Sequence, residues 1–213
     1  IPIENTSTGG INDTYDLLLD YDITIVAEHV VKVEQALLGK PGAKISDIKK
    51  VYSHPQGIMQ CSKFIREHNM ESESYMSTSS AAKKVAEEDD ISQGAIASTR
   101  AAKLFGLDVL KESINFESSN YTRFIIVTNQ KVFLSNANKI SLSFEIKHQA
   151  GALYNMLSNF YYNDLNLTKI ESRPIENRNW EYQFFVDIEG NLNDPGVRNA
   201  LACISECAKQ LTI

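Results

Sequence analysis

The sequence has few cysteines, few glycines, a single tryptophan and no long apolar run. Its 213 residues include three cysteines, ten glycines, five prolines and one tryptophan. Three cysteines do not make a disulfide framework, which favours a reducing compartment, and we expect the cytoplasm. No apolar stretch approaches the roughly 20 residues that a membrane-spanning helix needs, so we expect no membrane partner.

Positive charge is also scarce. There are 21 Lys and Arg against 27 Asp and Glu, a formal net charge of −6, and the cations are scattered along the chain. A nucleic-acid surface needs clustered cations, so no nucleic acid is expected as a partner. Cys203 and Cys207 are four residues apart on a predicted helix, but no His or further Cys is near enough to complete a zinc set. We therefore expect no metal and no cofactor, and no glycine-rich nucleotide-binding turn is present.

The first residues, Ile1-Pro2-Ile3, have no initiator Met, no basic segment and no apolar signal segment. We expect the chain to be part of a longer protein, entered at the end of a strand.

Up to about residue 128, one unit recurs: a short apolar run, a cluster of hydroxyl and amide residues, then a helical pattern. The four polar clusters lie at residues 4–10, 53–57, 77–80 and 98–99. Strands that alternate with helices in this way indicate an α/β sheet. Around residues 28–30 we expect the chain to cross between two lobes.

Each polar cluster lies where a strand ends and a helix begins. Unpaired backbone N–H groups and the positive end of the helix dipole meet there, so such a place can bind a small oxyanion. The alternative is that the Ser and Thr residues only cap helices, at about 1 kcal/mol each. Four clusters at strand ends favour a ligand site, since ligands of open α/β sheets bind at the carboxyl ends of strands.

From about residue 139 the pattern changes to strand, helix, strand, strand, helix, strand, which is the ferredoxin-like βαββαβ order. Residues 140–146 alternate apolar and polar, as in a half-buried antiparallel strand. The later elements are predicted at residues 150–162, 167–170, 182–188, 195–210 and 211–213, after a linker at 135–138.

Several motifs, in this order, resemble the motif series of prephenate dehydratases, especially the dehydratase part of bifunctional chorismate mutase-prephenate dehydratases. They are Pro2-Ile3-Glu4-Asn5-Thr6, Ser53-His54-Pro55-Gln56, Ser77-Thr78-Ser79 and Asn120-Tyr121-Thr122-Arg123-Phe124. Gly151-Ala152-Leu153 and Glu171-Ser172-Arg173-Pro174 are similar to motifs of that family's ACT regulatory domain. The resemblance implies a two-lobed, periplasmic-binding-protein-like catalytic domain over residues 1–130, N-terminally incomplete, and a ferredoxin-like ACT domain over 139–213.

The resemblance also implies a lyase that dehydrates and decarboxylates prephenate to phenylpyruvate in L-phenylalanine biosynthesis, with feedback inhibition by L-phenylalanine. Thr122 would hydrogen-bond the departing hydroxyl, and Glu4, Asn5 and Gln56 would complete the catalytic set. Glu4 either supplies a proton or orients Asn5, and the two amides either recognise substrate or cap helices. The implied substrate-binding residues are Thr6, Ser53, His54, Ser77, Thr78, Ser79, Arg123 and Phe124, although His54 has packing, and Arg123 an outward ion pair, as the alternative.

For L-phenylalanine, the resemblance implies a site at a domain–domain interface. It would be formed by Gly151, Ala152, Leu153, Glu171, Ser172, Arg173 and Pro174. Read without the family, Gly151 is a turn residue and Arg173 an ion-pair partner of Glu171. A homodimer or homotetramer is implied. The alternative functions are a non-catalytic solute-binding protein and an amino-acid-sensing module.

Overall fold

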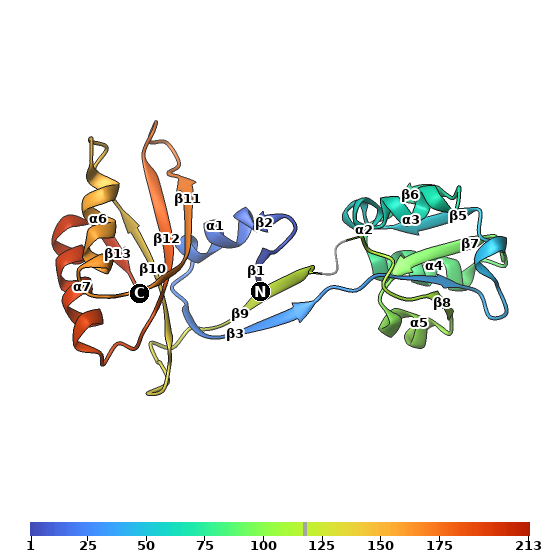
Figure 1. Cartoon of the computed structure of the whole chain (residues 1–213), viewed down its shortest axis with the longest axis horizontal. Coiled ribbons are helices and arrows are strands. Elements are labelled where there is room, and N and C mark those ends of the chain that lie inside the picture. Colours follow the sequence, from blue (N-terminus) through green and yellow to red (C-terminus); the bar gives the residue numbers. More distant parts are fainter. Residues whose placement is uncertain (117–118) are drawn as a thin grey trace. The chain divides into compact units, whose positions relative to one another are not determined.

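The computed structural model describes residues 1–116 and 119–213, which form two compact units of mixed α/β structure (Figure 1). Unit 1 comprises Ile1–Val31 and Thr122–Ile213, and unit 2 comprises Lys32–Tyr121. The chain enters unit 2 after Val31, next to the crossing predicted at residues 28–30. It returns at Thr122, so the predicted catalytic threonine is the first residue of unit 1 after the return.

Unit 2 contains a five-stranded sheet in the order β6-β5-β7-β4-β8. Its strands are β4 (Ala36–Gly39), β5 (Lys50–Ser53), β6 (Glu71–Ser74), β7 (Gln93–Ala97) and β8 (Asp108–Lys111). Its helices are α2 (Pro55–Gln60), α3 (Ser62–Glu67), α4 (Thr78–Glu87), α5 (Thr99–Phe105) and the 3₁₀ turn η1 (Ile45–Asp47).

Helices cover both faces of this sheet. The neighbours Leu37 and Leu38 are fully buried but belong to different apolar clusters, because successive side chains of a strand point to opposite faces. The cluster that contains Leu38 includes apolar residues of α4 and α5. The cluster that contains Leu37 includes Ile65 of α3 and Cys61, which lies between α2 and α3. A sheet that is covered on both faces explains the continuous apolar runs in β4 and β7.

Three of the four polar clusters lie at one edge of this sheet, as predicted. β5 is parallel to both β6 and β7, so the clusters that follow these strands meet at their shared carboxyl end. The first cluster was placed wrongly, because β1 (Pro2–Asn5) belongs to another sheet, in unit 1. The local pattern of a strand does not reveal its partners, and β1 pairs antiparallel with a segment more than 100 residues away.

That sheet of unit 1 has the order β2-β1-β9-β3. Its other strands are β2 (Gly9–Gly10), β3 (Thr24–Lys32) and β9 (Tyr121–Thr128), and helix α1 (Asn12–Asp20) follows β2. Asn5 lies opposite Thr122 and Glu4 lies opposite Arg123 in the β1–β9 pair. The register shifts between Pro2 and Glu4, where Ile3 is the extra residue.

The second sheet of unit 1 has the order β11-β12-β10-β13 and is antiparallel throughout. Its elements are β10 (Lys139–Glu145), α6 (Ala152–Tyr161), β11 (Leu167–Pro174), β12 (Tyr182–Glu189), α7 (Pro195–Cys207) and β13 (Gln210–Thr212). The predicted strand–helix–strand–strand–helix–strand order is confirmed, with β11 four residues longer than predicted.

The two faces of this second sheet are covered by different elements (Figure 1). Buried residues of α6 and α7, among them Phe160 and Ile204, pack with Val186 and Ile188 on one face. On the other face, Phe185 packs with Ile3, Tyr15 and Ile125 from β1, α1 and β9. This cluster joins the β11-β12-β10-β13 sheet to the strands that carry the predicted catalytic motifs. Within the described ranges, no helix is both long and apolar enough to cross a membrane.

Candidate functional site

The predicted catalytic residues Asn5 and Thr122 contact each other directly. Asn5 Nδ2 donates a hydrogen bond to Thr122 Oγ1 at 3.0 Å across the β1–β9 pair. Asn5 is buried, at 7% exposure, whereas Thr122 is half-buried. The hydrogen bond therefore ties a partly accessible hydroxyl to a fixed amide.

The turn after β1 fixes the orientation of the Asn5 amide. Its Oδ1 accepts hydrogen bonds from the backbone N–H groups of Ser7, at 2.9 Å, and Thr8, at 3.2 Å. Backbone nitrogens can only donate, so this atom must be the oxygen and the other must be the NH₂ group. The Thr122 oxygen is consequently an acceptor towards Asn5, and its single hydrogen can be donated to another group.

Glu4 and Arg123 form the next cross-strand pair, on the opposite face of the two strands. Arg123 is buried, at 9% exposure, and its Nη1 lies 2.6 Å from Asp187 Oδ2 and 3.1 Å from Glu28 Oε2. Its Nε lies 3.1 Å from Glu4 Oε1 without hydrogen-bond geometry, and Nη2 has no hydrogen-bond partner among the described residues. The predicted alternative for Arg123, an outward ion pair, is wrong, since its partners are buried or half-buried within unit 1.

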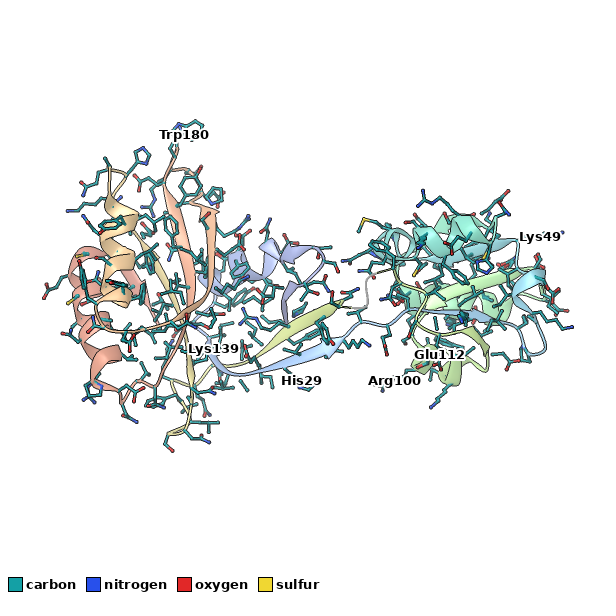
Figure 2. The ribbon with its side chains drawn as sticks, viewed as in Figure 1. His29, Lys49, Arg100, Glu112, Lys139 and Trp180 are labelled. Atoms are coloured by element: carbon teal, nitrogen blue, oxygen red, sulfur yellow. The ribbon has the colours of Figure 1, made fainter. Side chains whose placement is uncertain are left out.

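Two lysines extend this group. Lys169 pairs with the other carboxylate oxygen of Glu4, and Lys139 Nζ lies 2.5 Å from Glu28 Oε1. Lys139 is labelled in Figure 2 at the start of β10. Three carboxylates thus surround three cations. We call these six residues the ionic cluster: Glu4, Glu28, Arg123, Lys139, Lys169 and Asp187.

The charges in the ionic cluster stabilise one another against burial. Burial lowers the pKa of Lys169, but its hydrogen bond with Glu4 and the nearby Tyr15 hydroxyl outweigh burial and raise the pKa overall. Burial by itself would raise the pKa of Glu28, but the contacts with Lys139 and Arg123 outweigh burial and lower the pKa overall. The pKa of Arg123 is raised in the same way, against burial, chiefly by Asp187. All three groups are therefore held in their charged forms.

In unit 2, the predicted Ser53-His54-Pro55-Gln56 motif forms the end of β5 and the start of α2. Ser53 is fully buried, and its hydroxyl donates to the carbonyl oxygen of Ile96 at 2.7 Å. His54 is exposed and caps α2, because its Nδ1 accepts the Gln56 backbone N–H at 3.2 Å. Gly57 is needed here, since a Cβ atom would lie 2.5 Å from Ser53 Oγ. The Gln56 side chain is exposed.

The Ser77-Thr78-Ser79 motif begins helix α4. Ser77 is the N-cap, and its Oγ accepts the Ser80 backbone N–H at 3.0 Å while Ser80 Oγ accepts the Ser77 N–H at 2.9 Å. The capping alternative therefore holds for Ser77. Thr78 is half-buried and Ser79 is exposed at the same helix start.

The remaining predicted substrate residues lie in unit 1. Phe124 is half-buried on β9 opposite Pro2, and Thr6 is exposed in the turn after β1. Arg123, between Thr122 and Phe124, points away from the face of Thr122 because side chains alternate along a strand.

The predicted Gly151-Ala152-Leu153 motif lines a pocket at the start of α6. Other residues of the pocket include Tyr154, Trp180 and Tyr182, and Trp180 is labelled in Figure 2 on the β11–β12 connection. Gly151 has φ +78°, a left-handed conformation that a β-carbon disfavours, and a Cβ atom there would meet no heavy atom within 4 Å. The pocket combines backbone at a helix start with aromatic side chains.

The Glu171-Ser172-Arg173-Pro174 motif lies elsewhere, at the end of β11, and lines none of the pocket described above. Arg173 pairs with Asp16 of α1 through two hydrogen bonds, at 2.9 Å and 2.7 Å. The sequence predicted an ion pair of Arg173 with Glu171, and this partner is wrong. Arg173 pairs with Asp16 because β11 lies against α1. Within one chain, the first of the two predicted regulatory motifs lines this pocket and the second does not.

The sequence prediction missed Glu28, Lys139, Lys169 and Asp187. For Asp187 a signal was present, since it is the one acidic residue inside the apolar run 184–188. A carboxylate in a buried strand needs a partner, so its position indicates a buried cation. The other three residues are in contexts that are typical of solvent-exposed charge.

The family model for prephenate dehydratase matches residues 1–132. The chain is 36% identical over 215 residues to a bifunctional chorismate mutase/prephenate dehydratase of Aquifex aeolicus, covering 100% of this chain and 59% of that protein. The chain belongs to the prephenate dehydratase family. It spans less than two thirds of the length of such curated relatives.

Two solved structures with the same fold are each 30% identical to this chain in sequence. A prephenate dehydratase of Arthrobacter aurescens, solved in complex with L-Phe, is 30% identical, with a TM-score of 0.88 over 99% of this chain and 71% of that chain. A protein named GqqA, a novel type of quorum quenching acylase, is also 30% identical, with a TM-score of 0.89 over 100% of this chain and 78% of that chain.

Proposed function

We propose that the protein containing this chain converts prephenate to phenylpyruvate in L-phenylalanine biosynthesis, with loss of water and carbon dioxide. The observation that carries the proposal is the Asn5–Thr122 hydrogen bond, in which Thr122 is the acceptor and retains its hydrogen for another group. Membership of the prephenate dehydratase family supports it.

The chemistry places few demands on the protein. Loss of the ring hydroxyl and of a carboxylate makes an aromatic ring, so the driving force is large. The protein must hold a dianion and stabilise the oxygen as it leaves. A hydroxyl that is fixed by Asn5 and donates to the departing oxygen supplies the second requirement, since its hydrogen bond strengthens as negative charge develops.

Of the two roles considered for Glu4, we favour orientation over proton donation. Each carboxylate oxygen of Glu4 faces a cation, Oε1 that of Arg123 and Oε2 that of Lys169. Glu4 also lies on the opposite face of the strand pair from Thr122. Glu4 and Asn5 are adjacent on β1, so the ion pairs of Glu4 hold the strand from which Asn5 reaches Thr122.

For substrate carboxylates, we propose the helix starts at the carboxyl edge of the unit 2 sheet. The start of α4, a helix of ten residues, offers the Thr78 and Ser79 hydroxyls at the positive end of the helix dipole. Gln56 offers an exposed amide, and His54 borders it. Ser53 would act by shaping this edge, as its hydroxyl is committed to Ile96. Thr6, Ser77, Arg123 and Phe124 stay predictions as substrate contacts.

For regulation, we propose that the C-terminal part is an ACT domain that binds L-phenylalanine. The pocket at Gly151, Ala152 and Leu153 supports this, as do its aromatic walls. The Arthrobacter relative, at 30% identity, was solved with L-Phe. Because residues 171–174 do not line this pocket in one chain, the proposal includes a homodimer or homotetramer in which a second copy supplies them.

The remaining parts of the proposal rest on the resemblance: a catalytic domain over residues 1–130, a two-lobed periplasmic-binding-protein-like arrangement, an ACT domain at 139–213, and a cytoplasmic location.

The reaction is proposed to need no metal or cofactor. A chelator should leave turnover of the complete protein unchanged, and loss of activity with recovery on adding one metal would contradict this.

The decisive experiment is turnover of prephenate by the complete protein, followed as formation of phenylpyruvate with and without L-phenylalanine. Turnover that L-phenylalanine lowers supports both parts of the proposal. Binding of L-phenylalanine without turnover would indicate an amino-acid-sensing module, and binding of prephenate without turnover a solute-binding protein.

Hydrolysis of acyl amides, tested in parallel because of the acylase relative, is not favoured, since Asn5 donates to Thr122 and cannot activate it as a nucleophile.

A further inference from the structure

We infer that Asp187 is a positioning residue for Thr122 and acts through Arg123. This inference rests on the proposed role of Thr122 and adds a residue from the C-terminal sheet to the catalytic arrangement. It starts from the ionic cluster, where the Arg123–Asp187 contact, at 2.6 Å, is the shortest that Arg123 makes.

Asp187 is itself held firmly. It is 7% exposed and lies on β12, which pairs with both β10 and β11. One carboxylate oxygen binds Arg123 Nη1, and the other accepts a hydrogen bond from Ser141 Oγ at 2.7 Å. Both oxygens are therefore fixed, and Asp187 is a rigid anchor for the guanidinium.

Arg123 passes this constraint to Thr122 through the backbone of β9. The two residues are neighbours, so their side chains lie on opposite faces of the strand and a shift of one moves the other. Glu4 and Asn5 repeat the arrangement on β1, because Glu4 pairs with Arg123 and Asn5 with Thr122. One face of this strand pair is anchored to the C-terminal sheet, and the other presents the hydroxyl.

Burial makes the anchor depend on Asp187. Nε and Nη2 of Arg123 have no hydrogen-bond partner among the described residues. The side-chain hydrogen bonds of Arg123 to Asp187 and Glu28 are therefore both made by Nη1. Glu28 is one-third exposed and shared with Lys139, whereas Asp187 is buried. Removal of the Asp187 charge would leave the guanidinium buried with weaker partners and let β9 shift.

The test is Asp187→Asn in the complete protein. We expect kcat for prephenate to fall about 10- to 100-fold, with KM changed less than about 3-fold, because a displacement of under 1 Å at a reacting group has effects of this size. Amide hydrogen exchange at β1 and β9 should become faster. Asp187→Glu, which keeps the charge, should recover part of kcat.

Two variants serve as controls. Glu145→Gln removes another buried carboxylate of the same sheet, which pairs with Arg178 and, among the described residues, makes no side-chain hydrogen bond or ion pair with β9. This variant should leave kcat unchanged in the absence of L-phenylalanine. In a cycle with Arg123→Lys, the double variant should lose little more kcat than the worse single variant, since both changes break one connection.

Any one of three results would contradict the proposed positioning role of Asp187. They are unchanged kcat and unchanged exchange in Asp187→Asn, an equal loss in Glu145→Gln, or additive losses in the cycle. If Asp187→Asn does not fold, Ser141→Ala, which frees one carboxylate oxygen, should give a smaller loss of kcat in the same direction, and no loss would overturn the inference. If the wild-type protein does not turn over prephenate, the proposed function fails, while the exchange measurement still tests the anchoring of β9.

Discussion

Asn5 on β1 donates a hydrogen bond to Thr122 on β9 at 3.0 Å, although the two residues are 117 positions apart in the sequence. The turn at Ser7 and Thr8 fixes which atom of the amide donates. The direction of this hydrogen bond decides what the Thr122 hydroxyl can do next, and the first two predictions depend on it.

Thr122→Ala in the complete protein should lower kcat by about 10²–10³ and change KM much less, because the donated hydrogen bond strengthens in the transition state. Steady-state kinetics with prephenate measures this. Thr122→Ser, which keeps the hydroxyl, should retain most of kcat. An unchanged kcat in the alanine variant would remove Thr122 from the mechanism.

Asn5→Asp should lower kcat although the turn oxygen is kept. The new carboxylate has no N–H group and accepts hydrogen bonds, so the Thr122 hydroxyl would donate to it instead of to the substrate. We expect a loss comparable to that of Thr122→Ala, within about a factor of ten. If Asn5→Asp had full activity at neutral pH, the direction of the hydrogen bond would not matter for turnover.

Gly151→Val should weaken L-phenylalanine binding, measured by calorimetry, without unfolding the chain. The residue has φ +78°, which costs a β-branched residue roughly 1–3 kcal/mol of local strain, while the space around a Cβ atom is open. Gly151→Asn is the matched control, because Asn tolerates the left-handed region. Equal binding by the valine variant and wild type would contradict a role for this backbone.

Arg173→Ala should reduce the free energy of unfolding by no more than about 1 kcal/mol at neutral pH, because the Arg173–Asp16 pair is partly exposed. The hydrogen bond with Arg173 lowers the pKa of Asp16, so the stabilisation is complete above the unfolded value near about 4 and is lost as pH falls through the folded value. Denaturant unfolding of both proteins should therefore show a difference at pH 7 that disappears in acid. A difference independent of pH would mean that packing, not charge, accounts for the effect.

Cys61 should resist alkylation in the folded protein, since burial raises the pKa of its thiol to about 12. Cys207 is exposed and should react first, which serves as the internal control. Mass spectrometry after treatment near neutral pH, with and without denaturant, measures both. Rapid labelling of Cys61 without denaturant would show that the α2–α3 region opens readily.

The elements could largely be predicted from the sequence, because they depend on local periodicity. The alternation at residues 140–146 predicted β10, and the polar clusters predicted where α4 and α5 begin. The motif series in the first 124 residues likewise led to the family that the comparisons show.

Tertiary structure alone decided the partners. Nothing local to residues 2–5 indicates that β1 leaves the parallel sheet and pairs antiparallel with β9, because pairing depends on which distant strand is available. In the same way, Arg123 and Arg173 were recognisable as cations near motifs, but their anions, Asp187 and Asp16, come from segments 64 and 157 residues away. A residue type specifies what kind of partner it needs, and only the packing of the chain determines which residue fills that place.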